Sequence, residues 1–198
     1  MAKQLKETQM SELEAIAKRL AELEDREEIR AVIWLYSFLL DTGNWDRIAA
    51  EVFAEDGIDV HAERTDPPFV SQGRAELRAF FNMTMPNFDG TQHFLGPTVI
   101  ELDRDRAKAK TYAFCSHWLR HGEGAGDNRP ADCIMAICYD DELVRAPEGW
   151  RISLRRLHPF GPGSSLAVGY MPEFCMPGMG RDLYSPDAVE VELPTAVR

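Results

Sequence analysis

Apolar residues recur three or four positions apart over the first fifth of the chain, a spacing that predicts helices. The run Ser11-Glu-Leu-Glu14 has the form of a capping box and predicts where the first helix begins. A second helix is expected from about Arg26 to Leu40, and Gly43 ends it. The apolar positions of these helices are Leu13, Ile16, Leu20, Leu23, Ile29, Val32, Ile33, Tyr36, Leu39 and Leu40.

Two more helices are predicted downstream, over Trp45–Phe53 and Arg74–Met83. An extended segment is expected to begin at Ile58–Val60, and Arg64–Ser71 is expected to be a polar loop that contains proline. From Gln92 onward the apolar pattern changes to a period of two, which is typical of strands. The expected strands are Thr98–Leu102, Lys108–Leu119, Ala131–Tyr139 and Trp150–His158.

Helices followed by long strands indicate an α+β fold, in which a curved sheet, mixed or antiparallel, wraps over the N-terminal helices. The 198 residues suffice for one well-packed domain. We expect a helical arm at 1–25, the domain at 26–158, and an arm rich in glycine and proline at 159–198. The last segment keeps many apolar residues, which favours an arm packed on the domain, on a neighbour or at the mouth of a pocket.

Composition and charge exclude several classes of partner. The formal net charge of −11 argues against nucleic acids and anionic membranes, because both bind basic surfaces. No apolar run is long enough to cross a bilayer, and the polar N-terminus lacks the core of a secretion signal, so a cytoplasmic protein is expected. None of the four cysteines forms a CxxC pair, so a structural zinc site is not expected.

Three polar residues interrupt otherwise apolar elements. Asp41 closes an apolar helix face, while His93 and His117 lie in segments predicted to be strands. Burying such groups is costly unless they pair, and a histidine bonded to a carboxylate in an apolar pocket can act as a general base. Structural alternatives stay open. Asp41 can bond local amides, His93 can be a core histidine, and either face of the strand that holds His117 can point inward.

Other charged and polar residues favour structural interpretations. Arg155 and Arg156 occupy opposite faces of the last strand, so one of them is expected to point inward or to a subunit interface. A surface position is nevertheless favoured for each arginine taken separately. His61 and His121 lie beside charged or loop residues and are expected to be exposed, and His158 is expected to be structural.

Three motifs make the chain resemble the NTF2-like, or SnoaL-like, superfamily over roughly residues 25–158. The motifs are Tyr36-x4-Asp41-x3-Trp45-Asp46, Gln92-His93-Phe-Leu-Gly96 and Tyr112-x4-His117. Within the superfamily they are most similar to those of scytalone dehydratase and bile acid 7α-dehydratase. The resemblance implies a cone-shaped α+β barrel.

The same resemblance implies roles for four residues. Asp41 would orient and polarise His93, which would act as general base or acid. Tyr36 would donate a hydrogen bond to a substrate oxygen. His117 would correspond to the second histidine of scytalone dehydratase.

The expected pocket walls are mainly apolar and aromatic. The candidate substrate-binding residues are Trp45, Val60, Phe81, Phe94, Cys115 and Arg156, with Trp34, Phe38 and Trp118 as further candidate walls. Val60 stands where scytalone dehydratase has tyrosine, and Pro159 where the bile acid enzyme has arginine, so neither relative's substrate is carried over. A small hydrophobic or aromatic substrate is favoured over a sugar or a phosphate ester.

These features predict a cofactor-independent lyase of the dehydratase type, with neither a cofactor nor a metal. A lyase that releases formaldehyde from lignin-derived aromatic dimers and an isomerase with the same base are alternatives. A non-catalytic module for ligand binding or oligomerisation is an alternative of another class. A homo-oligomer is expected, with a trimer favoured over a dimer because the two dehydratases with similar motifs are trimers.

Overall fold

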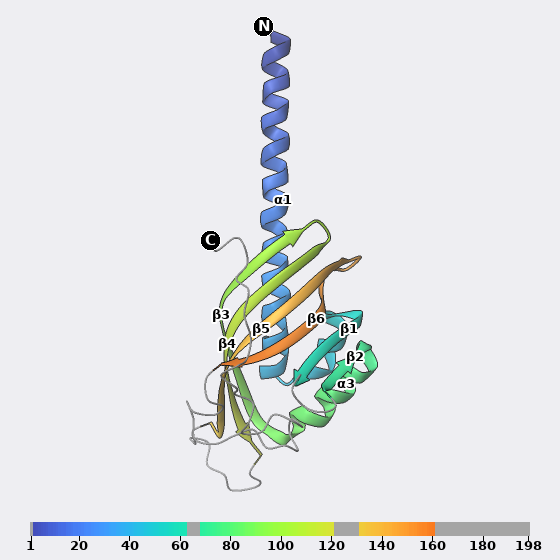
Figure 1. The fold of residues 1–198 in the computed structure, drawn as a ribbon, viewed down its shortest axis with the longest axis vertical. Helices are drawn as coiled ribbons and strands as arrows, with labels where there is room; N and C mark the ends of the chain where they lie inside the picture. Colours follow the sequence, from blue (N-terminus) through green and yellow to red (C-terminus); the bar gives the residue numbers. More distant parts are fainter. Residues whose placement is uncertain (1, 63–67, 121–130, 161–198) are drawn as a thin grey trace.

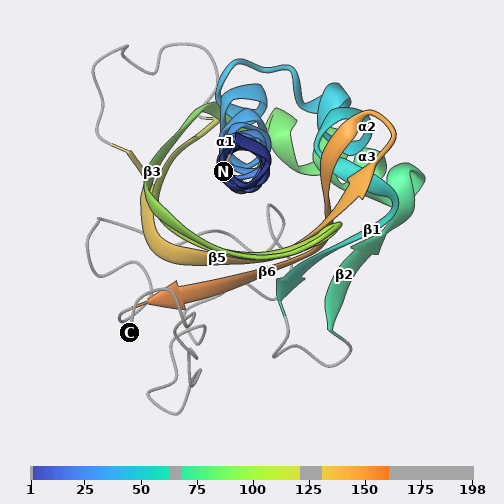
Figure 2. The ribbon, with the colours of Figure 1, turned by 90° about the horizontal axis from the view of Figure 1, so that it is seen from above.

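One long helix and a curved sheet make up most of the fold (Figure 1). The computed structural model describes residues 2–62, 68–120 and 131–160, so residues 161–198 of the expected C-terminal arm lie outside the described part. Helix α1, Ala2–Asp41, projects beyond the sheet with its first half. Its second half lies against the concave side of the sheet (Figure 2).

Helix α1 is a single helix rather than two. The prediction that a helix begins at Ser11 is wrong, because the helix runs through this position. Its end follows the prediction. Gly43 has a φ of 73°, and the amides of Gly43 and Asn44 donate to the carbonyls of Leu40 (3.2 Å) and Leu39 (2.8 Å).

Two consecutive side chains fix the point where α1 meets the sheet. The Asp25 carboxylate accepts hydrogen bonds from Arg145 Nη2 (2.6 Å) and Trp150 Nε1 (3.2 Å). Arg26 Nη1 donates to the carbonyl of Ile100 (2.6 Å). Residues upstream of Asp25 therefore form an arm, and residues downstream pack on the domain.

Short helices and six strands complete the described chain. The helical elements are η1 (Trp45–Arg47), α2 (Ile48–Glu51), α3 (Gly73–Thr84) and η2 (Met85–Asn87). The strands are β1 (Phe53–Ala62), β2 (Phe69–Gln72), β3 (Phe88–Asp103), β4 (Arg106–Leu119), β5 (Cys133–Ala146) and β6 (Gly149–Phe160). The last residues of the predicted loop Arg64–Ser71 are not loop, because Phe69–Ser71 belong to β2 and pair with β1. No helix in the described residues is both long and apolar enough to cross a membrane.

The six strands form one mixed sheet in the order β2-β1-β6-β5-β4-β3. Strands β1 and β6 run parallel, and the other neighbours are antiparallel. The predicted α+β arrangement, a curved sheet over N-terminal helices, is confirmed (Figure 2). Because β2 and β3 are edges, the sheet curves without closing into a barrel. The core lies between its concave face and the helices.

Strand β4 shows how alternation shapes the interior. Its buried residues are Ala107, Ala109, Thr111, Ala113, Cys115 and His117, and all of them face inward. The side chains of Tyr112 and Phe114 are exposed on the other face. The sequence alone did not show which face of this strand points inward. Small inward residues next to His117 leave space between the sheet and the helices.

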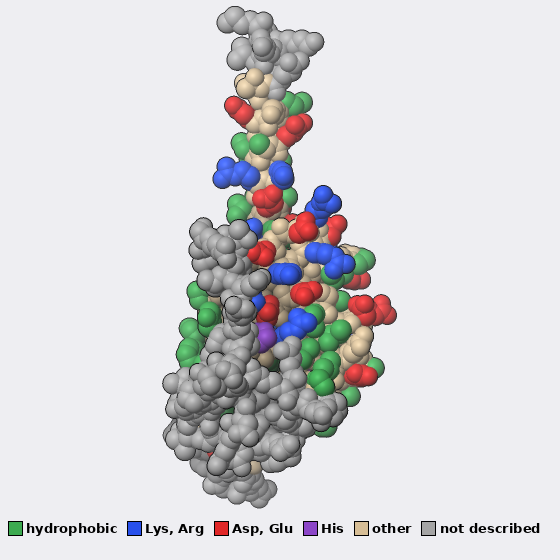
Figure 3. Space-filling view, in the orientation of Figure 1, with side chains coloured by type: hydrophobic (Ala, Val, Ile, Leu, Met, Phe, Trp, Pro, Cys, Tyr) green, Lys and Arg blue, Asp and Glu red, His purple; other side chains and the backbone are tan. Residues whose placement is uncertain are grey.

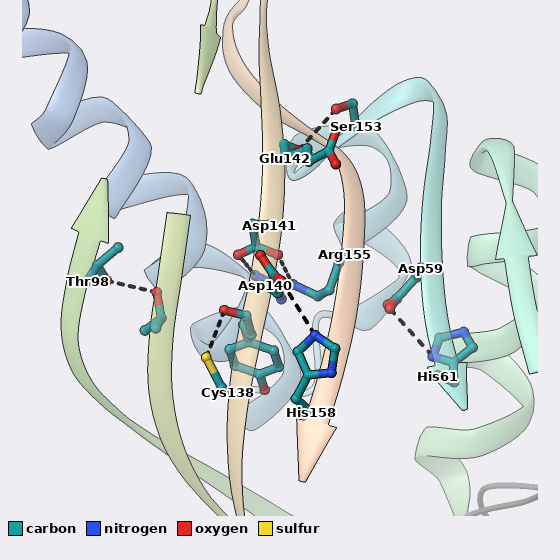
Figure 4. Close-up of polar contacts among 12 residues, drawn as sticks. Asp59, His61, Thr98, Cys138, Asp140, Asp141, Glu142, Ser153, Arg155 and His158 are labelled. Atoms are coloured by element: carbon teal, nitrogen blue, oxygen red, sulfur yellow. Dashed lines mark hydrogen bonds and ion pairs between the residues drawn. The ribbon is translucent and has the colours of Figure 1, made fainter. Parts of the chain in front are cut away.

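Arg155 is the arginine of β6 that points inward. Its side chain is fully buried and forms two hydrogen bonds with Asp141, from Nε to Oδ1 (2.7 Å) and from Nη2 to Oδ2 (2.8 Å) (Figure 4). The guanidinium lies 4.2 Å from the ring centroids of both Tyr36 and Tyr139. The expectation of a surface position is therefore wrong for Arg155, because a paired carboxylate and two aromatic faces offset the cost of burial.

Candidate active site

The carboxylate of Asp41 holds one short stretch of β3 through three contacts. Oδ2 accepts a hydrogen bond from the backbone amide of His93 (2.7 Å), and Oδ1 accepts one from Thr91 Oγ1 (2.9 Å). Oδ1 also lies 2.7 Å from His93 Nδ1. The ring is thus fixed with Nδ1 at the carboxylate, and Nε2 is directed away from it.

The two residues meet because of where their elements end and bulge. Asp41 is the last residue of α1, directly before the turn at Gly43. The register of β3 shifts between residues 88 and 90 and again between residues 95 and 98, so two bulges bracket His93. The side chain of His93 is 6% exposed and that of Asp41 is 23% exposed. The pair is therefore sheltered but not sealed from solvent.

A narrow cavity of about 40 Å³ lies beside the His93 ring. Its described walls are mostly apolar and aromatic, and come from α1, α3 and the strands. Five residues singled out by the sequence line it, namely Tyr36, Phe81, His93, Cys115 and His117. Of the four expected catalytic residues, Tyr36, His93 and His117 thus line one cavity, and Asp41 is bonded to the ring of His93.

Four other candidates lie outside this cavity. Phe94 follows His93 on β3, so strand alternation turns it to the opposite face, where it is 71% exposed. Val60 and Arg156 are register partners on β1 and β6 and face away from the cavity. Trp45 packs against the core from η1 instead. None of the four lines the cavity. For Val60, Phe94 and Arg156 the sequence did not show which strand face points inward.

His117 approaches His93 edge to face. Their ring centroids are 5.7 Å apart, with an angle of 84° between the rings. Within the described residues, Nδ1 of His117 has no hydrogen-bond partner. Burial and the neighbouring His93 lower the pKa of His117 to about 3, so the ring is neutral at physiological pH. A neutral imidazole in this place can hydrogen-bond a polar group of a bound molecule.

Tyr36 contributes a phenol to the cavity from the buried face of α1. Its ring makes edge contacts with Phe53, Phe81 and Tyr139. Burial and the nearby carboxyl of Asp59 raise the pKa of Tyr36 above its ordinary value. The phenol therefore keeps its proton and can act as a hydrogen-bond donor.

The fold and this arrangement of residues agree with a known family. Residues 21–156 match the SnoaL-like domain. The chain belongs to the SnoaL-like family. The resemblance indicated by the sequence motifs is thereby confirmed.

Proteins similar to this SnoaL-like chain include a mycobacterial relative and two solved structures. The uncharacterized protein Rv2910c of Mycobacterium tuberculosis is 28% identical over 137 residues, which are 69% of this chain and 86% of the relative. The crystal structure of an NTF2-like protein with a cystatin-like fold from Novosphingobium aromaticivorans has 28% identity and a TM-score of 0.58, and the match covers 77% of this chain and 92% of that one. A protein from the same organism, provisionally described as a scytalone dehydratase, has 21% identity and a TM-score of 0.59, with coverages of 78% and 94%.

The charge of His93 in the SnoaL-like domain depends on opposing effects. Burial disfavours the charged ring, whereas Cys115 and the bonded Asp41 carboxylate favour it, and the pKa of His93 rises from 6.5 to about 9. In neutral solution the resting protein therefore holds His93 as an imidazolium. Because the folded pKa is raised, this pair contributes its full stabilisation below about pH 6.5 and loses it as the pH rises through about 9.

Replacing Asp41 with Asn is expected to lower the pKa of His93 by about one unit or more, because an adjacent opposite charge shifts a pKa by about 1–3 units. NMR titration of the histidine Cε1–H signals would measure it. Asp140→Asn is the matched control, since Asp140 Oδ2 lies 3.5 Å from His158 Nε2. An unchanged His93 titration in Asp41→Asn would mean that this carboxylate does not set the charge of the ring.

A further histidine in the wall of the cavity was missed by the sequence analysis. His61 was expected to be exposed, which is wrong, since it is buried with its ring stacked on Phe80 at 3.6 Å. Its Nε2 lies 3.1 Å from Ser71 Oγ, and its Nδ1 lies 3.7 Å from Asp59 Oδ1 (Figure 4). The period of two in Ile58-Asp-Val-His61 put both polar residues on one face. It did not show that this face points inward.

Burial also shifts the titration of this second pair. It raises the pKa of Asp59 to about 7, with Arg155 opposing the shift and Asp141 adding to it. Burial lowers the pKa of His61 to about 3. At neutral pH, His61 is therefore uncharged, and Asp59 is partly protonated.

A wider groove of about 630 Å³ lies at the other end of the sheet. Arg26 of α1 lines it together with residues of β3, β4, β5 and β6, among them Lys108 and Glu142. It contains neither His93 nor Asp41, whereas His93 lines the smaller cavity. No group of three or more His, Cys, Asp or Glu side chains suited to hold a metal ion occurs in residues 2–62, 68–120 and 131–160.

Proposed function

We propose that this protein is a cofactor-independent lyase of the dehydratase type that acts on a small, hydroxylated, hydrophobic or aromatic substrate. The observation that carries the proposal is the 2.7 Å contact between Asp41 Oδ1 and His93 Nδ1 beside an apolar cavity. A carboxylate that orients an imidazole provides a positioned group for general acid–base catalysis. The neighbour described as a scytalone dehydratase is compatible with this reaction, but at 21% identity it supports the fold alone.

The proposed reaction needs one proton carrier. Neutral His93 removes a proton from a carbon activated by a carbonyl, phenol or extended conjugation. The electrons of the C–H bond form the new C=C bond as the C–O bond breaks. The imidazolium then returns the proton to the departing hydroxyl, and water leaves. No proton or electron is gained or lost overall.

Two cavity residues would stabilise the charge that develops. Tyr36 keeps its phenolic proton and can donate to an oxygen that becomes negative when the substrate is deprotonated. His117 is neutral, and its Nδ1 is available to the hydroxyl that leaves. Asp41 would remain a positioning residue, because its oxygens are already used by His93 and Thr91.

Substrate entry would require the cavity to widen. About 40 Å³ is room for one or two water molecules but not for an aromatic ring. The walls include flexible or planar side chains that can change rotamer, such as Met85, Phe88 and Met135. We therefore expect these side chains to separate when a ligand binds.

Two rival reactions use the same base and break a different bond. Loss of formaldehyde from a hydroxymethyl-bearing aromatic dimer would break a C–C bond, and an isomerase would return the proton to another carbon. Both would start from the Asp41–His93 pair. A ligand-binding module without catalysis would use the cavity but not the pair.

The proposal predicts turnover of aryl β-hydroxy ketones to conjugated enones, with kcat/KM rising with pH up to about 9 as His93 loses its proton. The purified protein would be incubated with these ketones and with hydroxymethyl-bearing aromatic dimers, and the products followed by mass spectrometry and ultraviolet absorbance. Loss of water supports the dehydratase. Loss of formaldehyde would instead indicate the formaldehyde-releasing lyase, and a product of unchanged mass would indicate the isomerase. Binding without turnover of any compound contradicts an enzyme.

A further inference from the structure

Helix α1 is apolar on two opposite sides. One side packs on the core through Ile29, Ile33, Tyr36 and Leu40. The other side carries large apolar residues that are 44–61% exposed, which we call the outer seam. The outer seam consists of Met10, Leu13, Ile16, Leu20, Leu23, Trp34 and Phe38.

Helical geometry places the apolar residues of the arm and those beside the domain on one side of α1, with the exposed Glu27–Arg30 ion pair between them. About 18 residues complete five turns of an α-helix, so Ile16 and Leu20 align with Trp34 and Phe38 along the helix. The rings of Trp34 and Phe38 stack on each other with centroids 4.8 Å apart, yet both stay exposed. The seam therefore recurs, beyond Glu27 and Arg30, on the half of α1 whose opposite side is already buried.

Within residues 8–62, 68–120 and 131–158, no side chain covers the part of the seam that lies on the arm. Every described side chain from residue 8 to residue 24 is exposed. Figure 3 shows this projecting part of α1, with hydrophobic side chains among charged ones. An isolated helix of this length is only marginally stable in water, and a row of exposed apolar side chains such as Leu13 to Leu23 is typical of an interaction surface.

We propose that the outer seam pairs in parallel with the same seam of a second copy of this chain. In the arm, Leu13, Ile16, Leu20 and Leu23 follow one another at steps of three, four and three residues. These steps place them at the a, d, a and d positions of two heptads, the pattern by which helices form a coiled coil. The surface is self-complementary, because each apolar layer meets its own copy.

The charges beside the seam favour the parallel orientation. In a parallel pair, a g residue lies near the e residue of the next heptad of the partner, so Arg19 meets Glu24 of the second copy. In an antiparallel pair in which Leu13 meets Leu23 and Ile16 meets Leu20, Arg19 would lie opposite Arg19 of the second copy. Attraction in one orientation and repulsion in the other select the parallel pair.

A cysteine placed at Ile16 tests both pairing and orientation. In a Cys175→Ser background, Ile16→Cys is expected to form an intermolecular disulfide on mild oxidation, because d residues of parallel helices face each other. The matched control, Ala15→Cys, lies on the side of the arm away from the outer seam and is expected to remain unlinked. Equal linking of the two variants, or no linking of Ile16→Cys, overturns the proposal.

The strength of the association gives a second test on the full-length protein. Leu13→Glu combined with Leu20→Glu is expected to raise the dissociation constant of the pair about 100-fold or more in sedimentation, since each buried leucine contributes about 1.5–3 kcal/mol. Ala15→Glu with Ala21→Glu places the same charges on the other side of the arm and is expected to change little. A monomeric wild-type protein, or equal effects of the two double variants, would contradict pairing through the outer seam.

Reversing one charge tests the pairing of Arg19 with Glu24. Arg19→Glu is expected to weaken association about threefold, the scale of an exposed ion pair. Adding Glu24→Arg is expected to restore it. Failure of the second change to restore the association overturns the parallel pairing.

Discussion

Replacing His93 with Gln is expected to lower kcat/KM for the substrate that the product assay identifies by about 100- to 10,000-fold, the range of a lost general acid–base group. Gln retains a polar side chain of similar reach, but it cannot carry a proton between carbon and oxygen. Thermal unfolding should show that the variant is still folded, because the ring of His93 is an edge of the cavity and not the centre of the core.

His158→Gln is the matched control for this experiment. His158 is also buried beside a carboxylate, that of Asp140, but it does not line the cavity (Figure 4). Its replacement should leave kcat/KM within a few-fold of the wild-type value. If His93→Gln and His158→Gln have equal effects, the loss reflects a weakened fold, and His93 is not the acid–base group.

Replacing Arg155 with Met is expected to lower the free energy of unfolding by about 3–5 kcal/mol, because it leaves the fully buried carboxylate of Asp141 without its partner. The pair of hydrogen bonds and the two aromatic contacts would be lost together. Urea unfolding followed by tryptophan fluorescence would measure the change.

Two further variants identify the cause of this loss. Arg156→Met removes the neighbouring arginine, whose side chain is 36% exposed and lies 3.9 Å from Glu142, so it should cost less than about 1 kcal/mol. Combining Arg155→Met with Asp141→Leu removes both buried charges and should recover most of the stability. If the combined variant is no more stable than Arg155→Met, the uncompensated carboxylate is not the source of the loss.

The helix–sheet order could be predicted from the sequence, because it depends on local signals. The Asp41–His93 pair joins distant residues, and it was expected from the cost of burying such groups and from the family resemblance. An apolar helix that ends in aspartate and glycine, and histidines inside strands, are visible along the chain itself. The long strand around His117 was also visible as an alternation of small and large residues. The sequence did not show which of its two faces meets the helices.

The positions that could not be predicted depend on pairing between distant segments. Val60 and Asp59 are neighbours, and only the parallel pairing of β1 with β6 places Asp59 on the interior side with Arg155. The same uncertainty assigned Phe94 to the pocket and His61 to the surface. Two helices were expected where the structure has one helix, α1, and the contacts of Asp25 with Arg145 and Trp150 hold the middle of that helix on the domain.

The bulges in β3 also make the chemistry of the cavity sensitive to chain length. Between the bulges lies a short stretch around His93. The hydrogen bond from the His93 amide to Asp41 fixes which residues of this stretch face the cavity. Deleting one residue from this stretch would present Phe94 to the cavity and turn His93 to solvent, exchanging an acid–base group for a hydrocarbon ring. Two homologues with similar residues but different spacing at this point would therefore differ in whether they can move a proton at all.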